Sequence, residues 1–230
     1  MKKIIISIIV ACNLLTPPEL YSYSNMEYVA RIDNQKNTYM CVAYAVCNAV
    51  ESQMRSLGIE VPKGGFSEAW LYAQCKAVDN LKVNEGTNIS TALNIARNIG
   101  LCPVNSFKTN TEIEDASKYK INSYSHIQNK DIKNEIANGK FVIIKTNVEK
   151  CNWLDNDDLI LPTKSKSARY HITFLVGFND AMSKKGYKGF YQGVNSWGTK
   201  WGDNGTYNMA YDYTINQAWI FEVKEGEQIE

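Results

Sequence analysis

Four side chains that could together catalyse acyl transfer occur in three short segments of the chain. Gln35 and Cys41 lie in the segment QKNTYMCVAYA, His171 opens HITFLVG, and Asn195 opens NSWGTKWGDNG. A cysteine thiolate can attack a carbonyl carbon, and an imidazole can move the proton. One amide can orient that imidazole and another can donate to an oxyanion. The order Gln, Cys, His, Asn therefore indicates a thiolate–imidazolium acyl-transfer site.

Cys41 stands at the start of a predicted helix. Apolar residues recur at helical spacing from Val42 to Leu57, and Gly58 is suited to end the helix. Unpaired N–H groups and the helix dipole at such a start favour a thiolate, and a neighbouring imidazolium would lower the thiol pKa further. The competing interpretation is a buried core cysteine. Cys47 on the same helix is expected to be one, or half of a disulfide.

Composition limits the possible partners. The chain has 230 residues, 44% of them hydrophobic, and a formal charge of +1. Nucleic acid or an acidic membrane surface is therefore not expected as the main partner. Neither a CxxC motif nor a Cys/His cluster at ligand spacing occurs, so no metal and no cofactor is predicted. Four further cysteines could form two disulfides or remain buried thiols: Cys47, Cys75, Cys102 and Cys151.

The first residues have the pattern of a secretory signal. Two lysines precede a short apolar stretch, and residues 1–24 are predicted as a signal peptide with cleavage near Ser22 to Ser24. Cys12, after Ile-Val-Ala, offers a lipoprotein anchor as an alternative, and a buried N-terminal strand of a cytosolic protein is a third interpretation. Export is favoured, to the periplasm, the cell envelope or the medium.

In the remaining residues, 25–230, the spacing of the apolar side chains changes from helical to strand-like near the middle of the segment. Helices are predicted at residues 41–57, 68–78, 88–99 and 131–138, and strands at 141–144, 171–178, 189–194, 206–210 and 219–223. An extended hairpin is expected over 179–189. A polar loop over 151–169 precedes His171 and is expected to be functional. His126 is expected at the surface. The pattern predicts an α+β protein with a helical lobe at about 33–120, a β lobe at about 121–225, and a cleft between them.

These motifs resemble the papain-like cysteine peptidases over about residues 28 to 224. His171 and Asn195 follow Cys41 at spacings that fit the roughly 130–150 residues typical of the family, once a small insertion is allowed. The resemblance implies a two-lobed fold whose C-terminal lobe is antiparallel and β-barrel-like. It also implies a likeness to bacterial members, and the short stretch before Asn37 leads us to expect no inhibitory propeptide.

The resemblance also implies roles for individual residues. Gln35 and the Cys41 amide would hold the oxyanion, His171 would be the general base, and Asn195 would orient it under the indole of Trp197. Substrate would bind along Glu85 and Gly86, where the backbone can pair with an extended peptide, and near Tyr170 and Trp197.

The segment around the nucleophile departs from the family pattern. Tyr39 and Met40 stand where the family usually has Gly-Ser, and Val42 replaces a tryptophan. Thr38 replaces a cysteine, so one expected disulfide is missing. Tyr170 places a bulky phenol before His171 and is expected to alter specificity.

The function that the sequence favours is hydrolysis of peptide bonds by a monomeric cysteine peptidase acting on peptides or proteins. Two other functions stay open. One is a related thiol acyltransferase or amidase, and the other is a papain-fold protein that binds peptides with little turnover.

Overall fold

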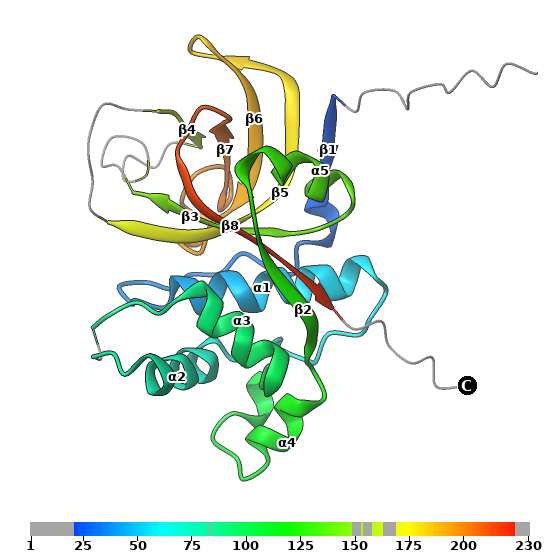
Figure 1. Ribbon diagram of the computed structural model, residues 1–230, viewed down its shortest axis with the longest axis vertical. Coiled ribbons are helices and arrows are strands. Elements are labelled where there is room, and N and C mark those ends of the chain that lie inside the picture. Colours follow the sequence, from blue (N-terminus) through cyan, green and yellow to red (C-terminus); the bar gives the residue numbers. More distant parts are fainter. Residues whose placement is uncertain (1–20, 83, 149–152, 154–157, 163–168, 224–230) are drawn as a thin grey trace, which may run out of the picture.

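The computed structural model describes residues 21–82, 84–148, 153, 158–162 and 169–223 (Figure 1). Cys12, Cys151 and most of the predicted signal peptide therefore lie outside the described residues. A layer of helices lies against one face of a large sheet. It contains α1 (Cys41–Ser56), α2 (Glu68–Asp79), α3 (Ile89–Asn98) and α4 (Glu112–Ser117). A short helix, α5 (Ile132–Ala137), contacts β1, β3 and β5. Three 3-10 turns complete the helical elements: η1 (Met26–Tyr28), η2 (Val104–Ser106) and η3 (Asn129–Asp131).

The helices begin and end where local chemistry sets them. The Ser67 hydroxyl accepts a hydrogen bond from the Trp70 backbone N–H at 3.2 Å, which caps α2. Asn80 then ends α2 in the left-handed conformation, with φ of 50°. The four helices predicted from the sequence are all present, with ends that differ by at most a few residues. Helix α4 was not predicted.

Eight strands form one sheet, in the order β2-β8-β3-β5-β6-β7-β4 with β1 paired to β5. The strands are β1 (Ser22–Ser24), β2 (Ile121–Ile127), β3 (Val142–Asn147), β4 (Leu159–Ile160), β5 (Tyr170–Lys184), β6 (Tyr187–Val194), β7 (Thr206–Ala210) and β8 (Ile215–Val223). The expected barrel-like closure is wrong. In the described part of the chain β2 pairs only with β8 and β4 only with β7, so the end strands do not meet and the sheet stays open.

The extended hairpin predicted over 179–189 is present between β5 and β6. Its turn contains Lys185 and Gly186, both at positive φ (48° and 84°). Two consecutive positive φ angles are typical of the tight turns whose twist matches that of paired strands. The hairpin carries β5 beyond the region in which it pairs with β3, and the extra length pairs with β1.

The sheet separates two apolar cores, because successive residues of a strand point to opposite faces. Ile143 of β3 and Ile172 of β5 pack with the helical layer on one face. Ile144 and Leu175 pack on the other face, against α5 and a group of aromatic side chains. Helix α1 contacts β3, β5 and β8. The start of α1 is thereby held against the strand that begins at Tyr170.

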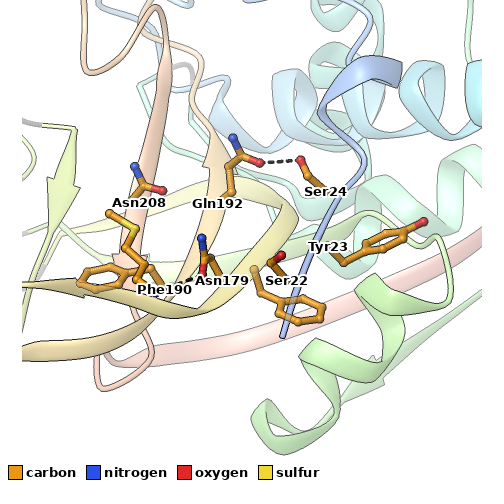
Figure 2. Close-up of a pocket in the computed structure, with 9 residues that line it drawn as sticks. Ser22, Tyr23, Ser24, Asn179, Phe190, Gln192 and Asn208 are labelled. Atoms are coloured by element: carbon orange, nitrogen blue, oxygen red, sulfur yellow. Dashed lines mark hydrogen bonds between the residues drawn. The ribbon is translucent and has the colours of Figure 1, made fainter. Parts of the chain in front are cut away.

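Strand β1 lies where the sequence places the signal cleavage site. Ser22 and Ser24 pair with Asn179 and Gly177 of β5, so the folded unit includes these residues. A cavity of about 420 Å³ lies beside β1, and Figure 2 shows two of its lining residues joined by a hydrogen bond of 2.6 Å from the Ser24 hydroxyl to the Gln192 amide oxygen. Its lining contains no histidine, cysteine or charged side chain. This cavity therefore lacks the groups that acyl transfer requires.

The described cysteines are thiols. Cys41, Cys47, Cys75 and Cys102 are all free, and all but Cys41 are buried. Disulfides among Cys47, Cys75 and Cys102 are therefore not formed in this structure, which agrees with the alternative of buried thiols. The surface position expected for His126 is confirmed: it is exposed on β2.

Candidate active site

A pocket of about 400 Å³ opens between the start of α1 and the start of β5. Its lining includes three of the four predicted catalytic side chains. The lining residues are Gln35, Thr38, Tyr39, Cys41, Gly86, Val148, Arg169, Tyr170, His171 and Trp197. Asn195 is buried behind them. Residues more than 150 positions apart in the sequence thus meet at one cleft.

The loop before Cys41 is fixed to the sheet by backbone contacts. The Gln35 N–H donates to the Ser196 carbonyl at 2.8 Å, and Asn34 bridges Trp197. Gly198 has a φ of +82°, and a Cβ there would lie 2.8 Å from Asn34 Nδ2. A glycine is therefore needed for this close approach. The contact sets where α1 begins, and Cys41 is its first residue.

The hydrogen bonds around His171 determine its tautomer. Its Nε2 lies 2.8 Å from Asn195 Oδ1, and the Ser196 backbone N–H donates to that same oxygen at 2.8 Å. A backbone N–H can only donate, so the Asn195 atom is the carbonyl oxygen and His171 Nε2 must carry the hydrogen. In the neutral ring Nδ1 is then unprotonated and can accept a proton.

Gln35 is oriented from both ends of its amide. The Ser196 hydroxyl donates to Gln35 Oε1 at 2.6 Å, and Gln35 Nε2 donates to the Thr38 carbonyl at 2.9 Å. An amide nitrogen carries two hydrogens, so the second remains available to a ligand in the pocket. The side chain is only 7% exposed, which limits its motion.

The family model of the papain family cysteine proteases matches residues 17–222 of the chain. The chain belongs to the papain family of cysteine proteases. Comparison with curated protein sequences gives no match.

Solved structures share the fold of this papain-family protease. Xylellain, a cysteine protease from Xylella fastidiosa, has a TM-score of 0.73 at 19% identity, over 91% of this chain and 84% of its own. Digestive procathepsin L 3 of Tenebrio molitor has a TM-score of 0.72 at 15% identity, over 90% and 71%. The bromelain protease of Ananas comosus, solved with the E64 inhibitor, has a TM-score of 0.70 at 16% identity, over 89% and 100%.

Aromatic rings enclose the imidazole of the protease. The Trp197 ring stacks on His171 with centroids 4.7 Å apart, and the edge of Trp153 meets His171 at 5.7 Å. Trp153 also stacks on Trp201 and donates from Nε1 to the Tyr213 hydroxyl at 3.0 Å. Trp153 is fully buried, although the sequence placed it in a polar loop. Only its tryptophan side chain, unusual in such a loop, could have indicated this.

Burial dominates the electrostatics of the thiol and the imidazole. It raises the pKa of the Cys41 thiol, and the backbone N–H groups of Ile172, Val42 and Cys41 lower that pKa in part. Burial lowers the pKa of His171 to about 4, and the hydrogen bond that its Nε2–H donates to Asn195 Oδ1 acts in the opposite direction. These directions oppose the thiolate and imidazolium expected from the sequence. Burial disfavours the Cys41 thiolate while His171 is neutral, and it disfavours the His171 imidazolium while Cys41 is a thiol. The two charges must therefore form together.

The predicted substrate-binding residues differ in their placement. Gly86 and Tyr170 both line the pocket, and Trp197 lines it beside His171. Tyr170 is 52% exposed and Tyr39 is 53% exposed. Glu85 does not line the pocket: its carboxylate accepts from the Lys82 N–H, and its carbonyl accepts from the Tyr72 hydroxyl. Glu85 thus shapes the turn that presents Gly86.

The described residues contain no group of three or more histidine, cysteine, aspartate or glutamate side chains that could hold a metal ion. Within the same residues, no helix combines the length and apolar character needed to cross a membrane.

Proposed function

We propose that this papain-family protease hydrolyses peptide bonds at the pocket through a covalent acyl-enzyme formed on Cys41. The observation that carries the proposal is the fixed tautomer of His171. Its Nε2–H is held by Asn195, so its Nδ1 is the ring nitrogen that faces proton transfer in the pocket that Cys41 also lines. A base with one orientation and one available nitrogen suits repeated proton transfer.

The first step is attack on the scissile carbonyl. His171 accepts the thiol proton as the Cys41 sulfur bonds to the carbonyl carbon, and the carbonyl oxygen becomes an oxyanion. The second Nε2–H of Gln35 and the Cys41 backbone N–H donate to that oxygen. Helix α1, which begins at Cys41, adds the partial positive charge of its N-terminus.

The second step releases the amine and then the acid. His171 gives its proton to the leaving nitrogen, the carbon–nitrogen bond breaks, and a thioester remains on Cys41. His171 next removes a proton from water, whose oxygen attacks the thioester carbon. The carbon–sulfur bond breaks, the carboxylic acid leaves, and the proton returns from His171 to the Cys41 sulfur. Trp197 and Trp153 cover the imidazole on two sides, which keeps bulk water from its bond to Asn195.

The deciding experiment joins thiol labelling with turnover. The purified protein is treated with an epoxide thiol trap and analysed by intact mass and peptide mapping, while hydrolysis of a fluorogenic peptide library is followed in parallel. We expect one adduct, on Cys41, slowed in His171→Ala, and hydrolysis that is lost in Cys41→Ala. Full turnover by Cys41→Ala, or an adduct on another residue that abolishes turnover, would contradict the proposal.

The same assay separates the two other functions. Formation of an amide with an added amine, at the expense of hydrolysis, would identify an acyltransferase. Tight peptide binding by the wild-type protein without any acyl-enzyme would identify a binding protein. The binding measurement is included because the bulky Tyr39 lies in the pocket lining.

We further propose that the protease is exported and acts as a monomer. The basic and apolar first residues support export, and Cys12 is the residue that a lipid anchor would use. N-terminal sequencing of the mature protein tests export, and its mass in solution tests the monomer. A start between Ser22 and Asn25 supports a cleaved signal, a blocked and lipidated Cys12 supports the anchor, and an intact Met1 opposes both.

A further inference from the structure

One strand face changes from apolar to charged behind Tyr170, which lines the pocket, and the charged residue, Lys145, is not itself a lining residue. Ile143 and Lys145 of β3 lie on the same face, since side chains alternate along a strand. Lys145 pairs with Ile172 of β5 on one side and with Gln217 of β8 on the other. Ile143 and Ile172 are buried against the helical layer, and Lys145 is half-buried. A lysine thus follows the core residue Ile143 on this face, before Asn147 ends the strand opposite Tyr170.

The Lys145 ammonium is held by an aromatic ring that lines the pocket. Its Nζ lies 4.2 Å from the centroid of Tyr170, a close cation–π contact. Tyr170 is half-exposed and belongs to the pocket lining. No carboxylate of the described residues forms an ion pair with Lys145. The ring fixes the position of the ammonium, and within the part of the chain that the structure describes no carboxylate pairs with its hydrogen-bond donors.

This charge acts at the nucleophile. Lys145 is the cross-strand partner of Ile172, the neighbour of His171, and its positive charge lowers the pKa of the Cys41 thiol. Arg169, a second cation, lines the pocket together with Tyr170. The Glu85 carboxylate lies outside the pocket lining and accepts from the Lys82 N–H within its own turn. The sheet side of the pocket is therefore positively charged close to the reacting atoms.

We propose that Lys145 and Tyr170 form a subsite for a substrate carboxylate close to the scissile bond. The inference rests on the proposed function, and it names the substrate class: peptides with Asp or Glu next to the cleaved bond, or with a free C-terminal carboxylate there. Such a carboxylate accepts hydrogen bonds from the ammonium, while the phenol ring covers its methylene groups. An apolar floor at Ile172 and a partly buried cation make the ion pair stronger than one in water.

The experiment compares matched peptide amides that carry Glu or Gln at each position around one cleavable bond. We expect kcat/KM to favour Glu over Gln by about tenfold at one position, as about 1.4 kcal/mol corresponds to tenfold. In a second arm, the same peptides carry a free or an amidated C-terminus. Preference at an internal position identifies side-chain recognition, and preference only for the free end identifies carboxypeptidase action.

Variants at position 145 test the assignment. Lys145→Met keeps the volume and removes the charge, and should bring the Glu/Gln ratio close to one. Lys145→Glu should reverse the order, so that Lys is favoured over Glu at that position. Lys130→Met changes the same charge at an exposed residue outside the pocket lining and should preserve the wild-type ratio.

The failure of this inference differs from that of the proposed function. Hydrolysis that depends on Cys41 but is indifferent to Glu, or that keeps its Glu preference in Lys145→Met, overturns the carboxylate subsite alone. Absence of hydrolysis and of a Cys41 adduct overturns the proposed function. In that case the Glu and Gln peptides are titrated onto the wild-type protein, and equal affinities overturn the subsite as well.

Discussion

The ring of Trp153 meets the ring of His171 edge-on, with centroids 5.7 Å apart and planes at 84°. Trp197 stacks on the same imidazole, and the two indoles also contact each other with centroids 6.0 Å apart, so they cover adjacent sides of a buried ring. Trp153 is held there by its Nε1–H bond to Tyr213 and by its carbonyl, which accepts from Trp201 Nε1 at 2.8 Å. Loss of water around the ring is what lowers the pKa of His171 to about 4.

Substituting Trp153 should therefore raise the pKa of His171. In Trp153→Leu, water enters beside the imidazole and its pKa should move from about 4 towards the ordinary value of about 6.5. NMR titration in a Cys41→Ala background measures this without coupling to the thiol. Trp219→Leu removes the tryptophan that contacts His126 and should leave His171 unchanged. An unchanged His171 in Trp153→Leu would contradict the proposed exclusion of water.

The same pKa makes stability depend on pH. Between about pH 4 and 6.5 the unfolded chain binds a proton at His171 that the folded protein does not, so the free energy of unfolding rises with pH in this window. The contribution is about 3 kcal/mol for a shift of this size. Urea unfolding across this range should show it, and the slope should be smaller in His171→Phe. An equal slope in both proteins would show that another group titrates.

Replacing Gln35 should impair catalysis and spare the thiol. Gln35→Ala removes one proposed oxyanion donor and should lower kcat by about 10²–10³. Its rate of alkylation by a haloacetamide should change little, because that displacement forms no oxyanion. Ser196→Ala removes only the hydroxyl that orients Gln35 Oε1, and we expect a loss of about fivefold. Equal losses of turnover and alkylation in Gln35→Ala would indicate a structural role.

The site was predictable from the sequence to the extent that its signals are local. Helical periodicity places Cys41 at a helix start, and β-branched and aromatic residues place His171 at the start of a strand. The orientation of Gln35 depends on Ser196, far along the chain, and no local pattern encodes that contact. Burial of Trp153 likewise depends on rings from three other segments. Lys145 follows the strand predicted over 141–144 as an ordinary polar residue, and only the register of β3 and β5 places it beside Tyr170.

The elements that the sequence did not predict lack apolar alternation. Strand β2 has mostly exposed or half-buried side chains, and its position comes from pairing with β8. Strand β1 has three residues and depends on the extra length of β5. Closure of the sheet was expected from the family resemblance alone. Neither the periodicity nor the turn residues of this chain carry information on whether the end strands meet.

The cysteine chemistry can be tested by differential labelling. Cys47, Cys75 and Cys102 are at most 1% exposed, and burial raises the pKa of each thiol. We expect alkylation of Cys41 in the folded protein, and of all four after denaturation without a reductant. Peptide mapping by mass spectrometry reports each site. Any of the three that is alkylated only after reduction would contradict the free thiols.

A cluster of charged side chains around Arg31, outside the pocket lining, fixes the segment that leads to Gln35. The guanidinium of Arg31 is bonded to Glu51 and Glu68, and to Asp33 at 2.6 Å. Glu51 also accepts from the Phe66 N–H at 2.8 Å, and its side chain is 1% exposed. Desolvation raises the pKa of Glu51 and of Glu68, and the charge of Arg31 opposes that rise.

Arg31→Met should therefore destabilise the protein most at high pH. Without the guanidinium, Glu51 is left as an uncompensated buried carboxylate, at a cost of about 3–5 kcal/mol. Its folded-state pKa rises further above the unfolded value of 4.5. The folded protein then binds a proton that the unfolded chain has lost, so the free energy of unfolding falls as the pH rises through that range. Urea unfolding at several pH values measures this, and Glu51→Gln added to Arg31→Met should recover part of the loss and flatten the slope. A loss that is independent of pH, or a double variant no more stable than Arg31→Met, would show that the arginine acts through packing.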